Sequence, residues 1–429
     1  MSDGRGAATN AAAVAEAARP IGPSLAGRLL DPPHARPLDP GRDPLPPPLR
    51  PGAALGVLDV TKWFGPSTGG VRTYLLEKAA YVTRDPRLRQ VLVVPGARDL
   101  VADADGVRCY QLRSPPVPGQ APYRLLLRGG ALRRVAGHER PHLIEAGSPL
   151  LVPWMAARAA RALGVPLVGF HHGLLPHGMR SHAARAAAWR YLRRLDHLFA
   201  VTLVGSDFAA AELRAAGITR TVRAPLGVDL DRFHPDRRLR ARAVRRAHGL
   251  PEDAPLVGFV GRFAGEKRLE LAVGAWPAVA RRSCAVLVLV GDGPRRARLE
   301  RLAAGVPVRF LPFQRDRDAV ADLIASFDLL LSAGEIETFG LAALEAMACG
   351  TPVLSADRGG VAELVQRSGA GRTFAAGSAA ALADEACALL REDLAALGRA
   401  GRAYAEREHA WEVAFGRIFA IYAEVAGRR

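Results

Sequence analysis

The stretch Glu335-Ile-Glu-Thr-Phe-Gly-Leu-Ala-Ala-Leu-Glu-Ala-Met-Ala-Cys-Gly-Thr-Pro-Val-Leu354 is the most informative part of this chain. The apolar residues 329–331 predict a strand that ends just before it, and Thr338-Phe339-Gly340 predicts the start of a helix. The free N–H groups and positive dipole end of a helix bind anions without any basic side chain. A strand followed by such a loop and helix is one unit of a parallel α/β sheet.

Two carboxylates flank the start of this predicted helix. Glu337 comes just before it and Glu345 lies within it, at a separation of roughly 10 Å for ~1.5 Å per helical residue. Each can accept hydrogen bonds from hydroxyl groups, one on either side of a bound diphosphate. Nucleotide-sugars have a sugar on one side of the phosphates and a ribose on the other, so they match this pattern. The alternative is a surface-loop glutamate and a solvated helix glutamate.

Apolar runs that alternate with helix-forming stretches fill much of the chain. In the first half the predicted strands cover residues 55–60, 91–94, 142–145, 166–170 and 198–201. In the second half they cover residues 256–260, 285–290, 308–311, 329–331 and 352–354. Buried apolar strands between helices predict parallel sheets. The expected fold class is therefore α/β, with two Rossmann-like doubly wound domains facing a cleft, and ligands bind at the carboxyl ends of such strands.

Composition and pattern divide the chain into five parts. Residues 1–52 are rich in Ala, Pro, Gly and Arg and predict a disordered tail, because few large apolar side chains can offset the entropy of ordering. Residues 53–224 form the predicted N-terminal domain and residues 237–405 the C-terminal domain. The irregular residues 225–236 form a predicted hinge, and residues 406–429 a C-terminal helix that packs back towards the N-terminal domain.

The composition argues against several classes of protein. A chain of 429 residues is too long for one ordinary core, and no uninterrupted apolar run is long enough to span a membrane. The N-terminus lacks the features of a signal peptide, and the four cysteines are far apart in apolar surroundings, so we expect reduced core thiols in the cytoplasm. The net charge of +17 permits an anionic partner. With 6% aromatic residues and no recognisable module, nucleic-acid binding is not expected.

Basic side chains follow two of the predicted strands. Arg262 and Lys267 come after the first strand of the second half, where both could reach one diphosphate. His171 and His172 follow the strand at 166–170, where a histidine can hydrogen-bond a sugar hydroxyl or help to carry charge at the reacting centre. The alternatives are solvated surface cations and a structural histidine.

Glycines and aspartates give weaker signals. Gly69 and Gly70 lie in a strand-to-helix turn, where glycine lets the backbone approach a phosphate closely. The turn matches neither the dinucleotide fingerprint nor a Walker A sequence. D-x-D triplets at residues 103–105, 229–231 and 316–318 lie in a predicted turn, the hinge and a charged loop, so we expect no metal site from them.

From about Leu55 to the C-terminus, the chain resembles the retaining glycosyltransferases of family 4, which have the GT-B fold of two Rossmann-like domains. The resemblance rests on the E-x7-E segment (Glu337, Glu345) and the G-R-x-x-x-x-K segment (Arg262, Lys267). It also includes the G-V-D-x-x-x-F hinge at 227–233, the V-G-D-G-P turn at 290–294, the glycine turn and the histidine strand end. Residues 1–52 lie outside the resemblance.

The resemblance implies a role for each site residue. Glu337 would contact sugar hydroxyls, Glu345 would accept hydrogen bonds from the ribose, and His172 would contact the donor sugar near its anomeric carbon. Arg262 and Lys267 would neutralise the departing diphosphate, so no metal or other cofactor is expected. The other implied contacts are the backbone at Phe339, Gly340 and Leu341, which would hold phosphate oxygens, and Gly69 and Gly70, where the helix of the first domain approaches them.

The implied activity is retaining transfer of a hexose, best matched by mannose from GDP-mannose, to a lipid or glycan acceptor on the N-terminal domain. The alternatives are a UDP-sugar donor, an epimerase or phosphorylase of the same fold, and a non-catalytic anion-binding protein. Arginines mixed with Leu, Trp and Tyr at residues 123–134 and 188–194 predict docking on an anionic membrane surface, unless these helices simply cover the sheet. We therefore expect a cytoplasmic protein that is peripheral on the inner face of the cell membrane.

Overall fold

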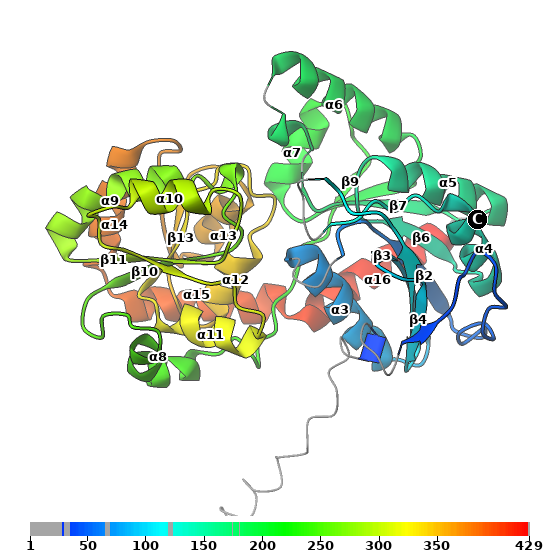
Figure 1. Ribbon diagram of the computed structural model, residues 1–429, viewed down its shortest axis with the longest axis horizontal. Helices are drawn as coiled ribbons and strands as arrows, with labels where there is room; N and C mark the ends of the chain where they lie inside the picture. The colour runs from blue at the N-terminus through cyan, green and yellow to red at the C-terminus, as the bar shows by residue number, and fades with distance from the viewer. Residues whose placement is uncertain are drawn as a thin grey trace, which may run out of the picture.

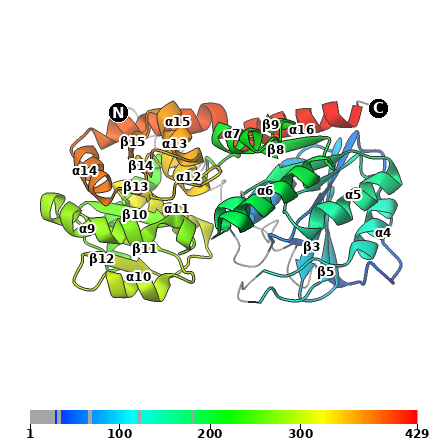
Figure 2. The same cartoon turned by 90° about the horizontal axis from the view of Figure 1, so that it is seen from above.

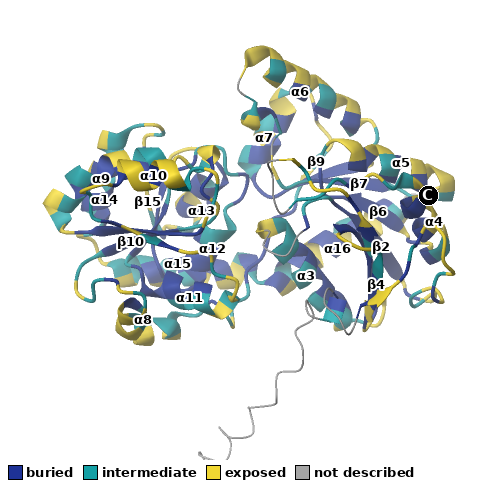
Figure 3. Ribbon diagram, viewed as in Figure 1, coloured by how far each residue is buried: buried dark blue, intermediate teal, exposed yellow. Residues whose placement is uncertain are grey.

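The computed structural model describes residues 28–29, 35–64, 69–118, 123–173, 175–179 and 181–427. These residues form two lobes, each with one sheet between two layers of helices (Figure 1, Figure 2). The central strands of each sheet are buried, while the outer faces of the helices are exposed (Figure 3). None of the described helices is both long and apolar enough to cross a bilayer. The predicted α/β class with two Rossmann-like domains is confirmed.

Nine strands within the described residues form the sheet of the N-terminal domain, in the order β1-β4-β5-β3-β2-β6-β7-β8-β9. The pairs from β5 to β9 are parallel, whereas β4 pairs antiparallel with β5 and with β1. The strands are β1 (Arg36–Pro37), β2 (Leu55–Val60), β3 (Leu88–Gly96), β4 (Leu100–Ala104), β5 (Val107–Arg113), β6 (Leu143–Ala146), β7 (Leu167–His171), β8 (Val201–Val204) and β9 (Thr221–Arg223). The α-helices are α3 (Gly70–Thr83), α4 (Gly129–Glu139), α5 (Leu151–Leu163), α6 (His182–Asp196) and α7 (Asp207–Ala215).

The C-terminal domain has a parallel sheet of six strands in the order β12-β11-β10-β13-β14-β15. The strands are β10 (Leu256–Val260), β11 (Val286–Val290), β12 (Val308–Leu311), β13 (Leu329–Ser332), β14 (Val353–Ala356) and β15 (Gly371–Phe374). The α-helices are α8 (Ala241–Ala247), α9 (Leu269–Ser283), α10 (Arg296–Leu302), α11 (Arg317–Ser326), α12 (Leu341–Ala348), α13 (Gly360–Ser368), α14 (Ala379–Leu389), α15 (Leu394–His409) and α16 (Trp411–Gly427).

The strand order reverses beside the first core strand of each sheet. β2 lies between β3 and β6, and β10 lies between β11 and β13, so the connections leave these strands in opposite directions. Such a reversal opens a crevice at the carboxyl ends of the strands, where ligands bind in open α/β sheets. The loops after β2, β7, β10 and β13 carry the predicted site residues.

The chain crosses between the domains twice, and the two crossings lie side by side. The Val228 N–H donates to the His409 carbonyl at 2.7 Å, and Val228 pairs with Ala410 in a short parallel bridge. Beyond this point α16 lies along the N-terminal domain against α3 (Figure 1, Figure 2). Its Tyr422 hydroxyl accepts a hydrogen bond from the buried Lys78 Nζ at 2.8 Å. The last helix therefore completes the core of the first domain.

The tail boundary predicted at residue 52 differs from the structure. Residues 35–52 lie against the N-terminal domain: β1 pairs with β4, and Leu38 is buried. Arginines of the domain hold the backbone of this segment, since Arg89 Nη1 donates to the Leu49 carbonyl at 3.2 Å and Arg108 Nη1 to the Pro47 carbonyl at 2.8 Å. These hydrogen bonds compensate for the few apolar side chains. Residues 1–27 and 30–34 of the predicted tail lie outside the described residues.

Three further details differ from the prediction. The strand expected at 198–201 begins at Val201, because the chain leaves α6 through a turn in which the Leu198 N–H donates to Leu195. β5 was not predicted, since charged residues interrupt it; Arg108 is nevertheless buried, paired with Glu139 at 2.7 Å. Cys284, expected in the core, is exposed where α9 ends.

Candidate functional site

One large cavity, of about 2120 Å³, lies between the two domains. Its wall includes the loops after β2 and β7 of the first domain and those after β10 and β13 of the second. All ten predicted site residues line it: Gly69, Gly70, His172, Arg262, Lys267, Glu337, Phe339, Gly340, Leu341 and Glu345. The fold therefore brings together residues that are up to 276 positions apart in the chain, from Gly69 to Glu345.

The starts of two helices face each other across this cavity. Gly340 precedes α12 with φ +98°, and an added Cβ would lie 2.3 Å from Val361 Cγ2, so only glycine fits. At the start of α3, an added Cβ on Gly70 would lie 3.0 Å from Leu341 Cδ1 of the other domain. The N–H groups of both first turns, which α-helices leave without intrahelical partners, therefore border the same space and favour an anion.

Two cations stand beside the start of α12. Arg262 is exposed in the cavity and forms no ion pair with any described residue. Lys267 Nζ forms an ion pair with Glu337. Burial lowers the pKa of Lys267, but Glu337 outweighs burial and raises the pKa overall, so the ammonium is charged at neutral pH. Among the predicted site residues, the cavity thus holds one paired and one unpaired cation; Arg315, which is exposed and also lines the cavity, forms no ion pair with a described residue either.

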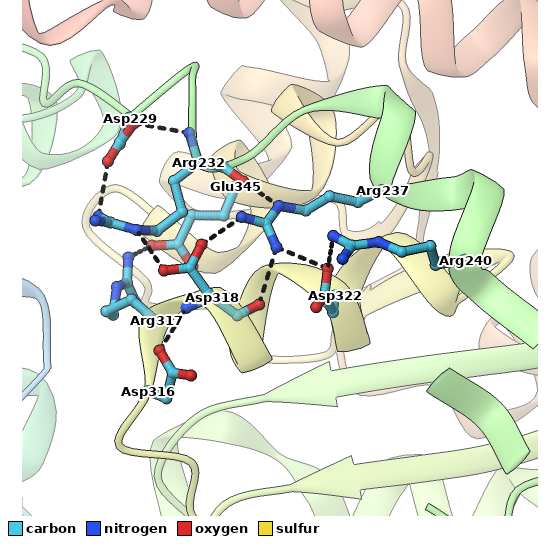
Figure 4. Close-up of polar contacts among 9 residues, drawn as sticks. All are labelled: Asp229, Arg232, Arg237, Arg240, Asp316, Arg317, Asp318, Asp322 and Glu345. Atoms are coloured by element: carbon cyan, nitrogen blue, oxygen red, sulfur yellow. Dashed lines mark hydrogen bonds and ion pairs between the residues drawn. The ribbon is translucent and has the colours of Figure 1, made fainter. Parts of the chain in front are cut away.

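Glu345 lies deeper, on α12, with a side chain that is 6% exposed. Arg317 Nη2 donates to its Oε1 at 2.5 Å (Figure 4). Ionised carboxylates are rarely buried without such a partner. Glu345 is therefore a buried, paired acceptor, and its interpretation as a solvated helix residue is wrong.

His172 is held by aromatic rings. Its imidazole stacks on Phe170 with ring centres 4.1 Å apart and lies 5.2 Å from Tyr74. Burial, with a smaller contribution from His171, lowers the pKa of His172 to about 3. Burial therefore favours the neutral ring, which suits a hydrogen bond to a sugar hydroxyl better than a charge-carrying role. Its buried Nε2 has no hydrogen-bond partner among the described residues, so it is available to a ligand hydroxyl.

The D-x-D triplets form ion pairs and caps. Asp316 caps α11, accepting a hydrogen bond from the Asp318 N–H at 2.9 Å. Asp229 pairs with Arg232 at 2.7 Å, and Asp103 pairs with Arg108 at 2.6 Å. In the described part of the chain, no group of three or more His, Cys, Asp or Glu residues is arranged to hold a metal ion.

Sequence reasoning missed several residues of the cavity. Arg317 follows the strand at 308–311, so the strand-end rule that selected Arg262 could have found it. Trp63 and Tyr123, in edge-to-face contact with ring centres 4.9 Å apart, line the N-terminal side. Nothing in their sequence context brings these two together, because they are 60 positions apart.

Polar contacts join the domains around the cavity. Thr338 Oγ1 donates to the His172 carbonyl at 2.9 Å, and Ser206 Oγ donates to the Thr338 carbonyl at 2.6 Å. Further out, Arg358 pairs with Glu212 at 2.9 Å. The loop before α12 is therefore in direct contact with the loop that carries His172.

Known families and proteins match this chain along both domains. The family "Glycosyltransferase Family 4" matches residues 68–232, and "Glycosyl transferases group 1" matches residues 254–392. A GDP-mannose-dependent alpha-(1-6)-phosphatidylinositol dimannoside mannosyltransferase of Mycobacterium tuberculosis is 36% identical over 315 residues, which cover 72% of this chain and 81% of the relative. A GDP-mannose-dependent alpha-mannosyltransferase of the same species is 30% identical over 383 residues, covering 86% and 97%.

Solved structures share the fold. The sucrose-phosphate synthase of Thermosynechococcus elongatus superposes with a TM-score of 0.70 at 21% identity, covering 87% of this chain and all of that one. The Anabaena protein HepE, solved in complex with UDP, has a TM-score of 0.68 at 20% identity and covers 86% of this chain and 100% of its own. The fold, the cavity and the relatives agree: the chain belongs to the family 4 glycosyltransferases and has their GT-B fold.

Proposed function

We propose that this glycosyltransferase moves mannose from GDP-mannose to a lipid or glycan acceptor, with retention of configuration at the anomeric carbon and without a metal ion. The observation that carries the proposal is Arg262, an exposed cation without an ion-pair partner among the described residues, in the cavity that the start of α12 also lines. By contrast, the exposed Arg268 and the partly exposed Arg295 have carboxylate partners. An unpaired guanidinium next to free helix N–H groups suits a diphosphate.

In this proposal the diphosphate of the donor lies against the start of α12. Arg262 and Lys267 stabilise the negative charge that develops on it as the glycosidic bond breaks. These cations take the part that a divalent metal has in other transferases. Neutral His172 hydrogen-bonds a hydroxyl of the donor sugar, and Glu337 accepts from another. No side chain is assigned as a covalent nucleophile, which suits attack by the acceptor on the same face from which the diphosphate leaves.

The relatives support this choice of donor and acceptor. Several relatives at 30–36% identity are named as GDP-mannose-dependent mannosyltransferases, and some of these are named for phosphatidylinositol mannosides. A mannosylated phospholipid is thus the first acceptor to test. A UDP-sugar is the second candidate donor, because the structural neighbour HepE was solved with UDP at a similar fold.

Membrane docking belongs to the same proposal. Of the two segments expected to dock, we propose only the one on α6. Of the two arginine-rich segments, the first is largely used internally, since Arg128 pairs with Asp99 at 2.5 Å and with Asp39. On α6, by contrast, Arg190, Arg193 and Arg194 are exposed. Exposed apolar side chains lie at the start of the adjacent helix α5: Leu150 (41%), Leu151 (53%) and Trp154 (40%). Cations beside exposed apolar groups suit the headgroup region of an anionic bilayer.

Transfer from labelled nucleotide-sugars tests the donor, stereochemistry and metal independence together. Purified protein is incubated with GDP-mannose, GDP-glucose, UDP-glucose or UDP-N-acetylglucosamine and with phosphatidylinositol mannosides, with and without a chelator. We expect product only from GDP-mannose, unchanged by the chelator, with an α linkage by NMR. Turnover that the chelator abolishes and Mg²⁺ restores would contradict the metal-independent part. A β-linked product would contradict retention, and transfer only from a UDP-sugar would contradict the donor.

A further inference from the structure

Arg317, the first residue of α11, connects the cavity to the deepest acidic residue of the site. Its guanidinium donates to Glu345 at 2.5 Å and lies 5.1 Å from the ring centre of Phe233, which is fully buried. The Arg317 side chain is 38% exposed and lines the cavity, whereas that of Glu345 is 6% exposed. Because a buried carboxylate needs a charged or hydrogen-bonding partner, Arg317 is the group that compensates and orients Glu345.

The residue after Arg317 is tied to the segment that joins the domains. Asp318 forms an ion pair with Arg237 and lies 3.6 Å from Arg232 Nε (Figure 4). Arg232 in turn pairs with Asp229 at 2.7 Å. All three partners belong to residues 229–237, which lead from the first domain into the second. The start of α11 is therefore held between Glu345 on one side and this connecting segment on the other.

A carboxyl of the first domain faces the same group of charges. Glu77 of α3 is partly buried, and this burial raises its pKa to about 7, with Asp229 acting in the same direction. Arg232 and Arg317 act against this rise, so both lie within electrostatic reach of Glu77. α3 is the helix whose first residue, Gly70, contacts Leu341 at the start of α12. Charges from both domains therefore meet around Arg317.

We propose that Arg317 is a positioning residue for the donor nucleotide. It pairs with the Glu345 carboxylate and orients it for the ribose hydroxyls, and it ties that carboxylate to the segment joining the two domains. The inference rests on the proposed function only in assigning the nucleoside part of the donor to Glu345. Arg317 acts through Glu345, whereas Arg262 and Lys267 act on the diphosphate.

Calorimetric binding of GDP, with UDP in parallel, to the wild type, R317Q, R317K, E345Q and R317Q/E345Q tests this role. Without Arg317, the buried Glu345 carboxylate loses the partner that compensates its charge and fixes its orientation. The GDP affinity of R317Q should therefore fall about tenfold relative to wild type. R317K keeps the charge and should stay within about threefold of wild type. The double variant should bind no more weakly than E345Q, because both changes remove one interaction.

R240Q is the matched control. Arg240 donates to Asp322 at 3.1 Å at the far end of the same group of ion pairs and does not touch Glu345 (Figure 4). Its loss should leave GDP affinity unchanged. Thermal unfolding of every variant reports whether it is folded. If R317Q does not fold, R317K still tests the role of Arg317.

Three results would overturn the inference alone. These are unchanged GDP affinity in R317Q, a loss in R317K as large as that in R317Q, and additive losses in R317Q/E345Q. Equal losses in R240Q and R317Q would also overturn it, because the effect would then belong to the whole group of ion pairs. A wild-type protein that binds neither GDP nor UDP would instead overturn the proposed function, and the inference with it.

Discussion

The charged side chains of the cavity differ in their neighbours, and those neighbours decide what the loss of each should do. Lys267 is paired with Glu337, Glu345 with Arg317, and Arg262 with no described residue. A paired carboxylate keeps its charge in a buried place, so neutralising it disturbs both members of the pair. An unpaired cation can instead bind a negatively charged ligand.

The first prediction separates the two glutamates. Glu345→Gln should mainly weaken donor binding, because a charge-assisted acceptor becomes a neutral one, a difference on the order of 1 kcal/mol. Glu337→Gln should mainly lower kcat, because its carboxylate would contact the sugar at the reacting end. Steady-state kinetics with GDP-mannose checks both variants, with GDP binding as a second measurement. Equal losses of kcat and affinity in the two variants would contradict this division.

The second prediction concerns His409, which is buried at the second crossing between the domains. Its Nδ1 lies 2.8 Å from the Leu226 carbonyl, and burial lowers its pKa from 6.5 to about 4. Since the unfolded chain binds this proton more readily, stability from this group is complete above about pH 6.5 and is lost as the pH falls towards 4. Between pH 7 and pH 5 the loss from this group is about 2 kcal/mol.

Urea unfolding at several pH values measures this effect. His409→Asn keeps a donor for Leu226 but does not titrate, so its free energy of unfolding should fall less steeply with acid than that of the wild type. His197→Asn, at an exposed position after α6, is the control and should leave the slope unchanged. The prediction fails if His409→Asn and the wild type lose stability in parallel.

Helix α16 contributes a side chain to the core of the N-terminal domain. It lies on the N-terminal domain and places Tyr422 in a buried polar group with Lys78, Asp59 and Glu145. Burial raises the pKa of Glu145 to about 7, while the charge of Lys78 opposes this rise. Lys78 is on α3 and Glu145 on β6, so the Tyr422 hydroxyl of α16 forms hydrogen bonds with two different elements of the N-terminal domain.

The third prediction tests this contact. Tyr422→Phe removes one hydroxyl and leaves Lys78 and Glu145 each with one partner fewer in a buried place, which should cost about 1–3 kcal/mol of unfolding free energy. Urea unfolding measures it. Tyr404→Phe on α15 is the control, since the hydroxyl of this buried ring forms no hydrogen bond with a described residue, and its cost should be well below 1 kcal/mol. Similar costs in the two variants would show that α16 is held by packing alone.

Across the whole molecule, the arginines fall into two groups: those that form ion pairs and those that form none with a described residue. Most described arginines form ion pairs that stabilise the surface or the domain contacts, such as Arg223 with Glu363 at 3.3 Å. Arg190 and Arg194 on α6 form none with described residues. α6 also projects from its domain (Figure 1). A net charge of +17 therefore leaves local surfaces where anion binding is favoured.

The fourth prediction is that α6 contributes to binding anionic vesicles. Each cation near such a surface contributes about 1 kcal/mol, falling off within a Debye length. Replacing Arg190, Arg193 and Arg194 with Gln should therefore weaken co-sedimentation with vesicles that contain phosphatidylinositol, most clearly at low salt. A charge-matched variant with Gln at the exposed Arg281, Arg301 and Arg399 of the C-terminal domain should bind as the wild type does. Equal binding to neutral and anionic vesicles would contradict the prediction.

Local pattern was sufficient to predict much of this protein. Apolar runs predicted β2, β10 and β12 with their observed bounds, because buried parallel strands leave an unbroken apolar signature. The segment from Glu337 to Glu345 predicted a loop and helix start, because glycine before a helix and a carboxylate on either side are local features. Weaker signals failed where charge interrupts a strand, as in β5, or where few apolar residues are held by distant arginines, as at residues 35–52.

Only the tertiary structure decided which side chains share an environment. The pairing of Arg317 with Glu345, the neutral state of His172 and the packing of Tyr422 beside Lys78 depend on segments far apart in the chain. Burial and the charge of a neighbour set these properties, and both are created when the two sheets and the last helix come together. The sequence determines which chemical group stands at each position, whereas the fold around that group determines its partners and its electrostatic environment.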